Sequence, residues 1–226
     1  MLLHQASIDI ANIREALKRP LPGLAAQLQM APPQRPNIVP KSEIAPRDAG
    51  VLMLLYPFHD ELHFVLTRRT EHLNKHKGQI SLPGGRHETG DVSFAETALR
   101  ETHEELGIDV KDAEVIGALT SLWVAPSNFV VHPIVAYTQL RPHFCINEDE
   151  VAEVIESPIS KLLDPSIIGV ERRSLISLNG AEQPVPHYLL GGHKVWGATA
   201  MVLAEFAAVI AQTASQEPTT HPSLPS

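Results

Sequence analysis

Three glutamates that lie close together in the chain, Glu101, Glu104 and Glu105, have the spacing of side chains on one edge of a helix. At about 100° per residue, positions i, i+3 and i+4 share one face of the helix. Like charges in this arrangement destabilise an isolated helix, and near its C-terminal end they also oppose the helix dipole. A hard divalent cation such as Mg²⁺ relieves the repulsion, because it takes carboxylate oxygens and leaves positions open for substrate phosphate. The spacing predicts a metal and phosphate site; the alternative is a solvated acidic face.

The residues around these acids favour a helix from Phe94 to Leu106. Ser93 and Glu96 have the spacing of a capping box, in which each side chain accepts a hydrogen bond from the other residue's backbone N–H. Gly107 stands where a left-handed residue commonly ends a helix. The preceding loop, residues 83–85, contains two glycines, which let the backbone approach a ligand closely. A glycine loop that leads into an acidic helix edge is typical of a metal-phosphate site.

This segment resembles the signature of the Nudix hydrolases, in which a glycine, an acid and an Arg-Glu-X-X-Glu-Glu-X-Gly string follow one another. Here Gly85 begins the pattern and residues 100–108 end it. The departures are Asp91 in place of the first Glu, eight residues between Asp91 and Arg100, and Thr102 in place of an aliphatic residue. The added residue resembles the coenzyme A pyrophosphatase branch of the family.

That branch has a second signature upstream, and this chain matches part of it. The agreements are Thr67, Arg69, Gly78 and the Pro-Gly-Gly of residues 83–85, and the departures are Thr70, Asn74 and Leu82. The resemblance implies an α/β fold, a Nudix-type α/β/α sandwich with a mixed central sheet, preceded by an N-terminal helical extension. It also implies Mg²⁺ or Mn²⁺ held by Glu101, Glu104, Glu105 and the Gly84 carbonyl.

The implied reaction is hydrolysis of the pyrophosphate bond of coenzyme A or acyl-CoA to 3′,5′-ADP and a 4′-phosphopantetheine product. The residues expected to contact this nucleotide substrate are Arg68, Arg69, His76 and Gln79. Two alternatives stay open: the same chemistry on ADP-ribose or NADH, and a Nudix protein that senses a nucleotide without turnover. The complete set of helix carboxylates argues against a pure sensor.

The general base is expected among three carboxylates, Glu150, Glu104 and Glu101. Glu150 ends an acidic run, 147–150, and resembles the Glu of an Asp-Glu-Val element in the coenzyme A branch. The alternative is that this run is an exposed, solubilising loop. Arg100 is expected to pair with Glu96 or Glu104 and so to orient the acids.

Charge and composition narrow the function further. Residues 68–87 carry five basic side chains against one acid, and residues 88–105 carry six acids against one arginine, a pairing that suits a polyphosphate ester and metal ions. The net charge of −8 argues against non-specific binding of nucleic acid. Cys145 is the single cysteine, so its expected role is a buried thiol in a reducing compartment. No apolar run is long enough for a membrane span and no signal pattern begins the chain, so we expect a cytoplasmic protein. A homodimer is compatible with the sequence. The 12 histidines show no zinc-binding spacing.

A chain of 226 residues with 43% hydrophobic content suits one globular domain with an extension. We expect a helical and Pro-rich extension over 1–45, a Nudix domain over 46–214 and a disordered tail over 215–226. The expected strands are 50–56, 63–68, 115–122 and 130–138, with a late hairpin of 173–178 and 187–195 around Asn179-Gly180. The expected helices are 8–19, a short one near Leu24, a turn at 158–163 and a buried helix over 197–214. Trp123 is expected in a loop, where it either stacks on adenine or packs as a core or lid residue.

Overall fold

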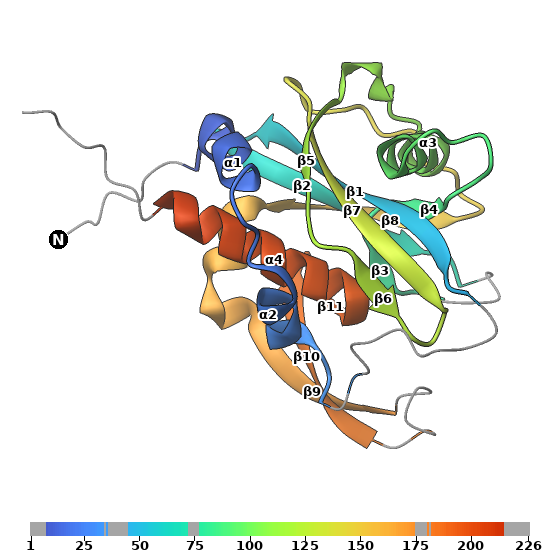
Figure 1. The fold of residues 1–226 in the computed structure, drawn as a ribbon, viewed down its shortest axis with the longest axis vertical. Helices are drawn as coiled ribbons and strands as arrows, with labels where there is room; N and C mark the ends of the chain where they lie inside the picture. Colours follow the sequence, from blue (N-terminus) through green and yellow to red (C-terminus); the bar gives the residue numbers. More distant parts are fainter. Residues whose placement is uncertain are drawn as a thin grey trace, which may run out of the picture.

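The computed structural model describes residues 8–33, 35, 45–71, 77–174, 180 and 182–214 (Figure 1). The helices are α1 (Ile10–Leu17), α2 (Gly23–Gln27), α3 (Phe94–Leu106) and α4 (Gly197–Ala214), with 3-10 helices η1 (Leu28–Met30), η2 (Val110–Asp112), η3 (Ile159–Leu163) and η4 (Pro165–Ile167). The first strands are β1 (Arg47–Phe58), β2 (Glu61–Arg69), β3 (Ile80–Ser81), β4 (Gly84–Arg86), β5 (Glu114–Ala118) and β6 (Leu122–Val124). The later strands are β7 (Phe129–Tyr137), β8 (Val151–Pro158), β9 (Ile168–Ser174), β10 (Glu182–Leu190) and β11 (His193–Trp196).

Within the described residues, eight strands form a mixed sheet. Its order is β3-β2-β1-β7-β5, with β4 paired to β1, β6 to β7 and β8 to β2. The β1–β7 pair is parallel, and the other pairs in this sheet are antiparallel. The centre of β1, Leu52–Tyr56, is buried at every position, as expected for an apolar strand that is covered on both faces.

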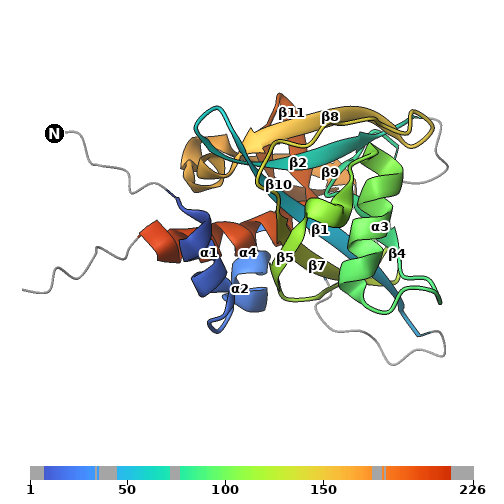
Figure 2. The ribbon, with the colours of Figure 1, turned by 90° about the horizontal axis from the view of Figure 1, so that it is seen from above.

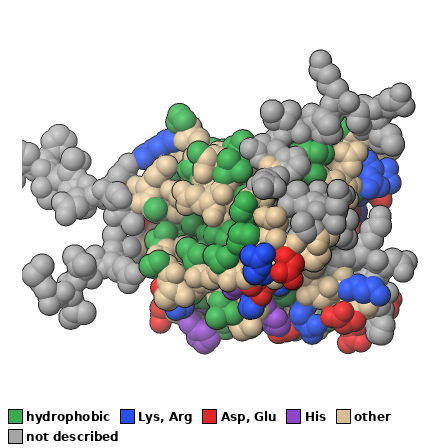
Figure 3. Space-filling model, turned by 90° about the horizontal axis from the view of Figure 1, so that it is seen from below, with side chains coloured by type: hydrophobic (Ala, Val, Ile, Leu, Met, Phe, Trp, Pro, Cys, Tyr) green, Lys and Arg blue, Asp and Glu red, His purple; other side chains and the backbone are tan. Residues whose placement is uncertain are grey.

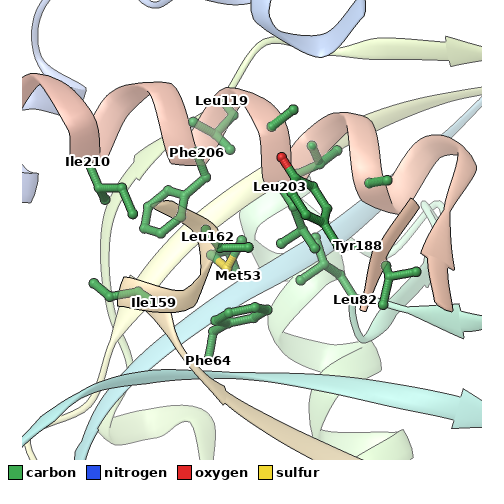
Figure 4. Close-up of a cluster of buried hydrophobic side chains, with 14 of the residues drawn as sticks. Met53, Phe64, Leu82, Leu119, Ile159, Leu162, Tyr188, Leu203, Phe206 and Ile210 are labelled. Atoms are coloured by element: carbon green, nitrogen blue, oxygen red, sulfur yellow. The ribbon is translucent and has the colours of Figure 1, made fainter. Parts of the chain in front are cut away.

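Helices cover both faces of this sheet, so the α/β/α sandwich expected from the sequence is confirmed (Figures 1 and 2). Leu52 and Leu54 of β1 belong to the core on the α3 side, together with Ala98 and Leu106 of the helix. Successive strand side chains point to opposite faces, and the intervening residues accordingly join the other core. That core contains Met53, Leu55, Phe64, Leu203 and Phe206, and Figure 4 shows several of its members against α4. Helix α4 is thus the buried helix that its apolar sequence predicts.

The helices expected over 8–19 and near Leu24 are confirmed as α1 and α2, and both pack beside α4 (Figure 2). A fully buried carboxylate on α4, Glu205, fixes α2 in place. It accepts hydrogen bonds from Gly23 N (3.1 Å), Gln27 Nε2 (2.8 Å) and Thr120 Oγ1 (2.6 Å), and also from Thr120 N. One charged side chain therefore ties the N-terminal segment and the β5–β6 connection to the C-terminal helix.

A separate antiparallel sheet, in the order β11-β10-β9, packs against α4. Several hydrophobic side chains of β9 and of the α2–η1 segment are exposed, namely Leu24, Leu28, Ile168 and Val170. Figure 3 shows hydrophobic side chains gathered on this lower face, whereas α3 lies at the opposite end of the molecule (Figure 1). No helix in the described ranges is long and apolar enough to cross a membrane.

Two strands expected from the sequence prove to be interrupted. The strand expected over 115–122 divides into β5 and β6 at Thr120, whose backbone N donates to Glu205 Oε2 (3.1 Å), while Leu119 N still bonds to Pro133 O of β7 (2.9 Å). The strand expected over 187–195 divides into β10 and β11 at Gly191 and Gly192, whose φ values of 54° and 81° form a tight turn.

Three further expectations also need correction. The strand expected over 173–178 instead begins at Ile168 and reaches Ser174, and residues 175–179 lie outside the described part. Trp123 lies in β6 rather than in a loop, half-buried, with its Nε1 donating to Asn128 Oδ1 (3.2 Å). Cys145 is exposed rather than buried, because the segment that carries it runs along the surface end of α3. The expected tail, 215–226, also lies outside the described residues.

Candidate active site

Helix α3, which carries the three glutamates, begins and ends as its sequence predicts. Ser93 Oγ accepts from Glu96 N (3.2 Å), and Gly107 adopts the left-handed conformation with φ of 64°. Half of the capping box differs from the expectation, because the Glu96 carboxylate accepts from Val92 N (2.6 Å) and not from Ser93 N. The added hydrogen bond orders the loop that enters the helix.

Arg100 is the organising cation at this edge. Its Nε donates to Asp91 Oδ1 (3.0 Å), and its Nη1 lies 3.0 Å from Glu101 and 3.2 Å from Glu104. Its Nη2 donates to the Arg86 carbonyl (3.1 Å) and to Asp91 Oδ2 (3.1 Å). The hydrogen bonds from Arg100 lower the pKa of Asp91 far below its ordinary value, with help from Glu88 N and Thr97. Arg100 therefore orients the acids, and of the two partners expected from the sequence it contacts Glu104.

Glu105 is the most buried of the three helix acids, with a side chain that is 3% exposed. Its Oε1 accepts from Arg69 Nη1 (3.3 Å), and its Oε2 accepts from Gly84 N (3.3 Å). Burial raises the pKa of Glu105 to about 7, although Arg69 and Gly84 oppose the shift. Glu105 therefore binds both the glycine loop, through Gly84, and the arginine of the upstream signature, Arg69.

Glu101 lies directly against the glycine loop. A Cβ atom on Gly85 would stand 2.5 Å from Glu101 Cδ, so any other residue at this position would displace the carboxylate from its present place. Burial raises the pKa of Glu101 above its ordinary value although Arg100 opposes the shift, and the negative charges of Glu104 and Glu150 add to the rise. Glu104 differs from its two neighbours, because its side chain is 53% exposed.

Glu150 approaches the same carboxylates from a distant loop. Thr70 N bonds to Glu150 O (3.0 Å) and Asn147 N bonds to Glu105 O (2.9 Å), so the acidic run is held between the end of β2 and helix α3. Glu150 is half-buried, while Glu148 and Asp149 are exposed. After burial, the charge of Glu150 is among the causes that raise the pKa of both Glu101 and Glu105.

These acids fit a divalent cation by their chemistry. Two of them are ionised only at a cost, because burial and mutual repulsion disfavour the charged forms, and a bound cation removes that cost. Within the described ranges, however, no three His, Cys, Asp or Glu side chains stand close enough to hold an ion as they lie here. Arg69 and Arg100 occupy the carboxylate oxygens that a metal would use.

The residues expected to bind substrate lie in different settings. Arg69 is at the site through Glu105, and Gln79 is next to it, because Arg69 N bonds to Gln79 O (3.0 Å). Arg68 pairs instead with Glu153, with its Nε 2.8 Å from Oε2. His76 lies outside the described residues.

Sequence reasoning did not find the contacts that join these segments. Thr70, a departure from the upstream signature, donates through Oγ1 to Asp149 O (3.0 Å) and so anchors the acidic run. Asp91 accepts from Arg100 and is itself held by Thr97 Oγ1 (2.8 Å), and the matching position of Asp91 in the family pattern was the available signal.

Comparison with known proteins defines the class to which this fold and site belong. Residues 46–173 match the family model of the NUDIX domain. The chain therefore belongs to the Nudix hydrolases and is a pyrophosphohydrolase.

Three relatives show how the similarity extends along the chain. The chain is 34% identical over 183 residues to an uncharacterized Nudix hydrolase, NudL, of Pectobacterium atrosepticum, covering 80% of this chain and 88% of the relative. It is 33% identical over 208 residues to the mitochondrial coenzyme A diphosphatase NUDT8 of Homo sapiens, covering 89% of this chain and 79% of the relative. It is 32% identical over 183 residues to Nudix hydrolase 3 of Caenorhabditis elegans, covering 75% of each. A solved MutT protein from Methanosarcina mazei superposes with a TM-score of 0.47 at 18% identity, covering 78% of this chain and all of that one.

Proposed function

We propose that the protein hydrolyses the pyrophosphate bond of coenzyme A or acyl-CoA to 3′,5′-ADP and a 4′-phosphopantetheine product. One observation carries the substrate: the relative described as a coenzyme A diphosphatase matches 89% of this chain. Further support comes from Arg69 of the upstream signature, which contacts a carboxylate of the acidic helix edge. The reaction itself is that of the family.

We propose that Glu101, Glu104, Glu105 and the Gly84 carbonyl hold Mg²⁺ or Mn²⁺. When bound, such an ion neutralises the diphosphate and lowers the pKa of an attacking water. Arg69 would then turn from Glu105 toward solvent or substrate, whereas Arg100 would keep its bonds to Asp91 and release only the contacts of its Nη1 to Glu101 and Glu104. Arg69 is the better placed of the two to donate to substrate phosphate, because Asp91 and the Arg86 carbonyl hold Arg100.

The general base is proposed to be Glu150, with Glu104 and Glu101 as the alternatives. Glu150 is half-buried, and its charge raises the pKa values of two helix acids, Glu101 and Glu105. Among the described residues, no hydrogen bond joins its carboxylate to theirs. A carboxylate in this position can accept a proton from water without being a metal ligand. Glu150→Gln is expected to lower kcat by about 10²–10⁴-fold at saturating Mg²⁺. A loss of less than a few-fold would move the role to the helix carboxylates.

A substrate panel tests the proposal. The protein is incubated with each of four substrates, coenzyme A, acetyl-CoA, ADP-ribose and NADH, in the presence of Mg²⁺ or Mn²⁺. The products are separated by liquid chromatography and identified by mass spectrometry. We expect the highest kcat/KM for a coenzyme A substrate, with 3′,5′-ADP as a product. Preference for ADP-ribose or NADH would favour the alternative that the departures Thr70, Asn74 and Leu82 leave open. Binding without turnover on the whole panel would favour a nucleotide sensor. The cytoplasmic location and the homodimer stay predictions.

A further inference from the structure

A pocket of about 460 Å³ opens between the main sheet and the second sheet. Strand β11 lies against β3, and Thr199 Oγ1 at the start of α4 donates to Ile80 O (3.3 Å), which fixes one wall. The pocket is lined by Lys77, Gly78, Gln79, Ile80, Arg173, Gly192, His193, Lys194 and Trp196. No carboxylate is among these lining residues.

Positive charge exceeds negative charge around this pocket. One carboxylate, Glu171, pairs with both Arg173 and Lys194, so it neutralises only one of the two cations. Lys77 is exposed, and no described carboxylate forms an ion pair with it. Glu71 lies against Gly78 at the margin and is exposed, as Lys77 is, so the two acids Glu71 and Glu171 leave one net positive charge from Lys77, Arg173 and Lys194.

Two of these cations are held in fixed positions. Arg173 stacks on the ring of Trp196, with its Cζ 4.4 Å from the ring centroid, and Glu171 fixes its guanidinium from the side. Lys194 Nζ contacts the second oxygen of the same carboxylate. A guanidinium and an ammonium anchored in this way are preorganised donors for an anion with several oxygens, such as a phosphate group.

The pocket borders the candidate active site through β2. Gln79, on the pocket wall, bonds to the backbone of Arg69, whose side chain reaches Glu105. Arg68, which precedes Arg69 in β2, pairs with Glu153. Glu153 Oε1 in turn lies 3.1 Å from Nε2 of His193, a residue that lines the pocket. A ligand that passes the sheet edge at Gln79 would place its diphosphate at the helix edge and a second phosphate in the pocket.

We propose that this pocket binds a phosphomonoester on the nucleotide end of the substrate, and so selects 3′-phosphorylated nucleotides over their unphosphorylated counterparts. The proposal rests on the proposed function for the choice of a 3′-phosphate. The pocket cations should nevertheless bind the phosphomonoester in the absence of turnover and of metal. This binding is measured separately from hydrolysis.

The test compares binding of 3′,5′-ADP and 5′-AMP to the full chain in EDTA by isothermal titration calorimetry. The wild type is expected to bind 3′,5′-ADP at least about tenfold more tightly, since a phosphate held by two cations gains charge-assisted contacts. The double variant Lys77→Gln/Lys194→Gln should reduce this ratio to less than about threefold. Lys111→Gln, which removes the same charge from an exposed residue of η2 outside the pocket, should keep the wild-type ratio. Thermal melting confirms that the variants fold, and the single variant Lys194→Gln replaces the double variant if the latter does not.

Equal affinity of the wild type for the two nucleotides, or a variant that keeps the full preference, would overturn the pocket assignment. Hydrolysis separates this outcome from failure of the proposed function. If the wild type cleaves coenzyme A and dephospho-coenzyme A equally well and the calorimetric ratio is near one, the pocket assignment is wrong and the reaction stands. If it cleaves neither but shows a calorimetric preference that the double variant loses, the coenzyme A reaction is wrong and the phosphate pocket stands.

Discussion

Replacing Glu105 by Gln is expected to stabilise the metal-free protein at neutral and alkaline pH while it removes activity. Burial raises the pKa of this carboxyl to about 7 in the folded protein. Below its ordinary pKa the group is neutral in both the folded and the unfolded chain. As the pH rises, the unfolded chain releases the proton first, so the folded state loses stability until the pH has passed about 7. Glutamine has nearly the same shape and never ionises.

The size of the effect follows from the two pKa values. With about 4.5 in the unfolded chain and about 7 in the folded protein, ionisation of Glu105 lowers the free energy of unfolding by about 1 kcal/mol at pH 5 and about 3 kcal/mol at pH 8. The stability difference between Glu105→Gln and wild type should therefore grow by about 2 kcal/mol over this range. Contributions that do not depend on pH, such as small packing changes, cancel in this comparison.

Urea unfolding in EDTA at pH 5, 6, 7 and 8, followed by tryptophan fluorescence, measures the difference. The control is Glu104→Gln, which makes the same change at a 53% exposed position of the same helix, so that the two variants differ in the burial of the replaced side chain. A Glu105→Gln difference that is constant within about 0.5 kcal/mol from pH 5 to pH 8 would refute the reasoning, because it would mean that burial does not disfavour this charge.

Three other changes follow from the same structure. Gly85→Ala puts a methyl group where the Glu101 carboxylate lies, so kcat/KM should fall by about 10²-fold with little change in melting temperature; near-normal kinetics would show that the carboxylate can move without consequence. Asp91→Asn removes the charge that holds Arg100, so Mn²⁺ affinity measured by electron paramagnetic resonance should fall, and unchanged affinity would count against an orienting role for this arginine. Glu205→Ala leaves several buried donors without an acceptor and should lower the free energy of unfolding by about 3 kcal/mol in urea; a loss below about 1 kcal/mol would contradict the tie between α2 and α4.

Local signals explain the parts of the site that the sequence predicts well. The start of α3 at Ser93 and its end at Gly107 depend on hydrogen bonds and backbone angles within a few residues. The residue types at these positions, Ser and Gly, favour those bonds and angles. The buried strand β1 and the buried helix α4 follow from continuous apolar runs. The shared face of the three glutamates follows from helix geometry alone.

The parts that the sequence does not predict depend on contacts between distant segments. No local pattern says that Arg69 reaches Glu105 or that Thr70 anchors the loop of Glu150. The break at Gly191–Gly192 differs from these contacts, because a Gly-Gly pair between two short strand-like runs is itself a local turn signal that the sequence carries. The different burial of Glu105 and Glu104 depends on the contacts that β2 and the glycine loop make with Glu105.

The most direct test of the account is the turnover of Glu104→Gln on coenzyme A at saturating Mg²⁺, beside the wild type. The substitution removes one charge from the helix edge at an exposed position, so the fold should persist. We predict that the wild type releases 3′,5′-ADP only when a divalent cation is present, and that kcat of the variant falls by at least about 10²-fold, because the metal loses a hard anionic ligand. A folded variant with near-normal turnover would contradict the claim that the acidic edge of α3 is the metal site of this hydrolase.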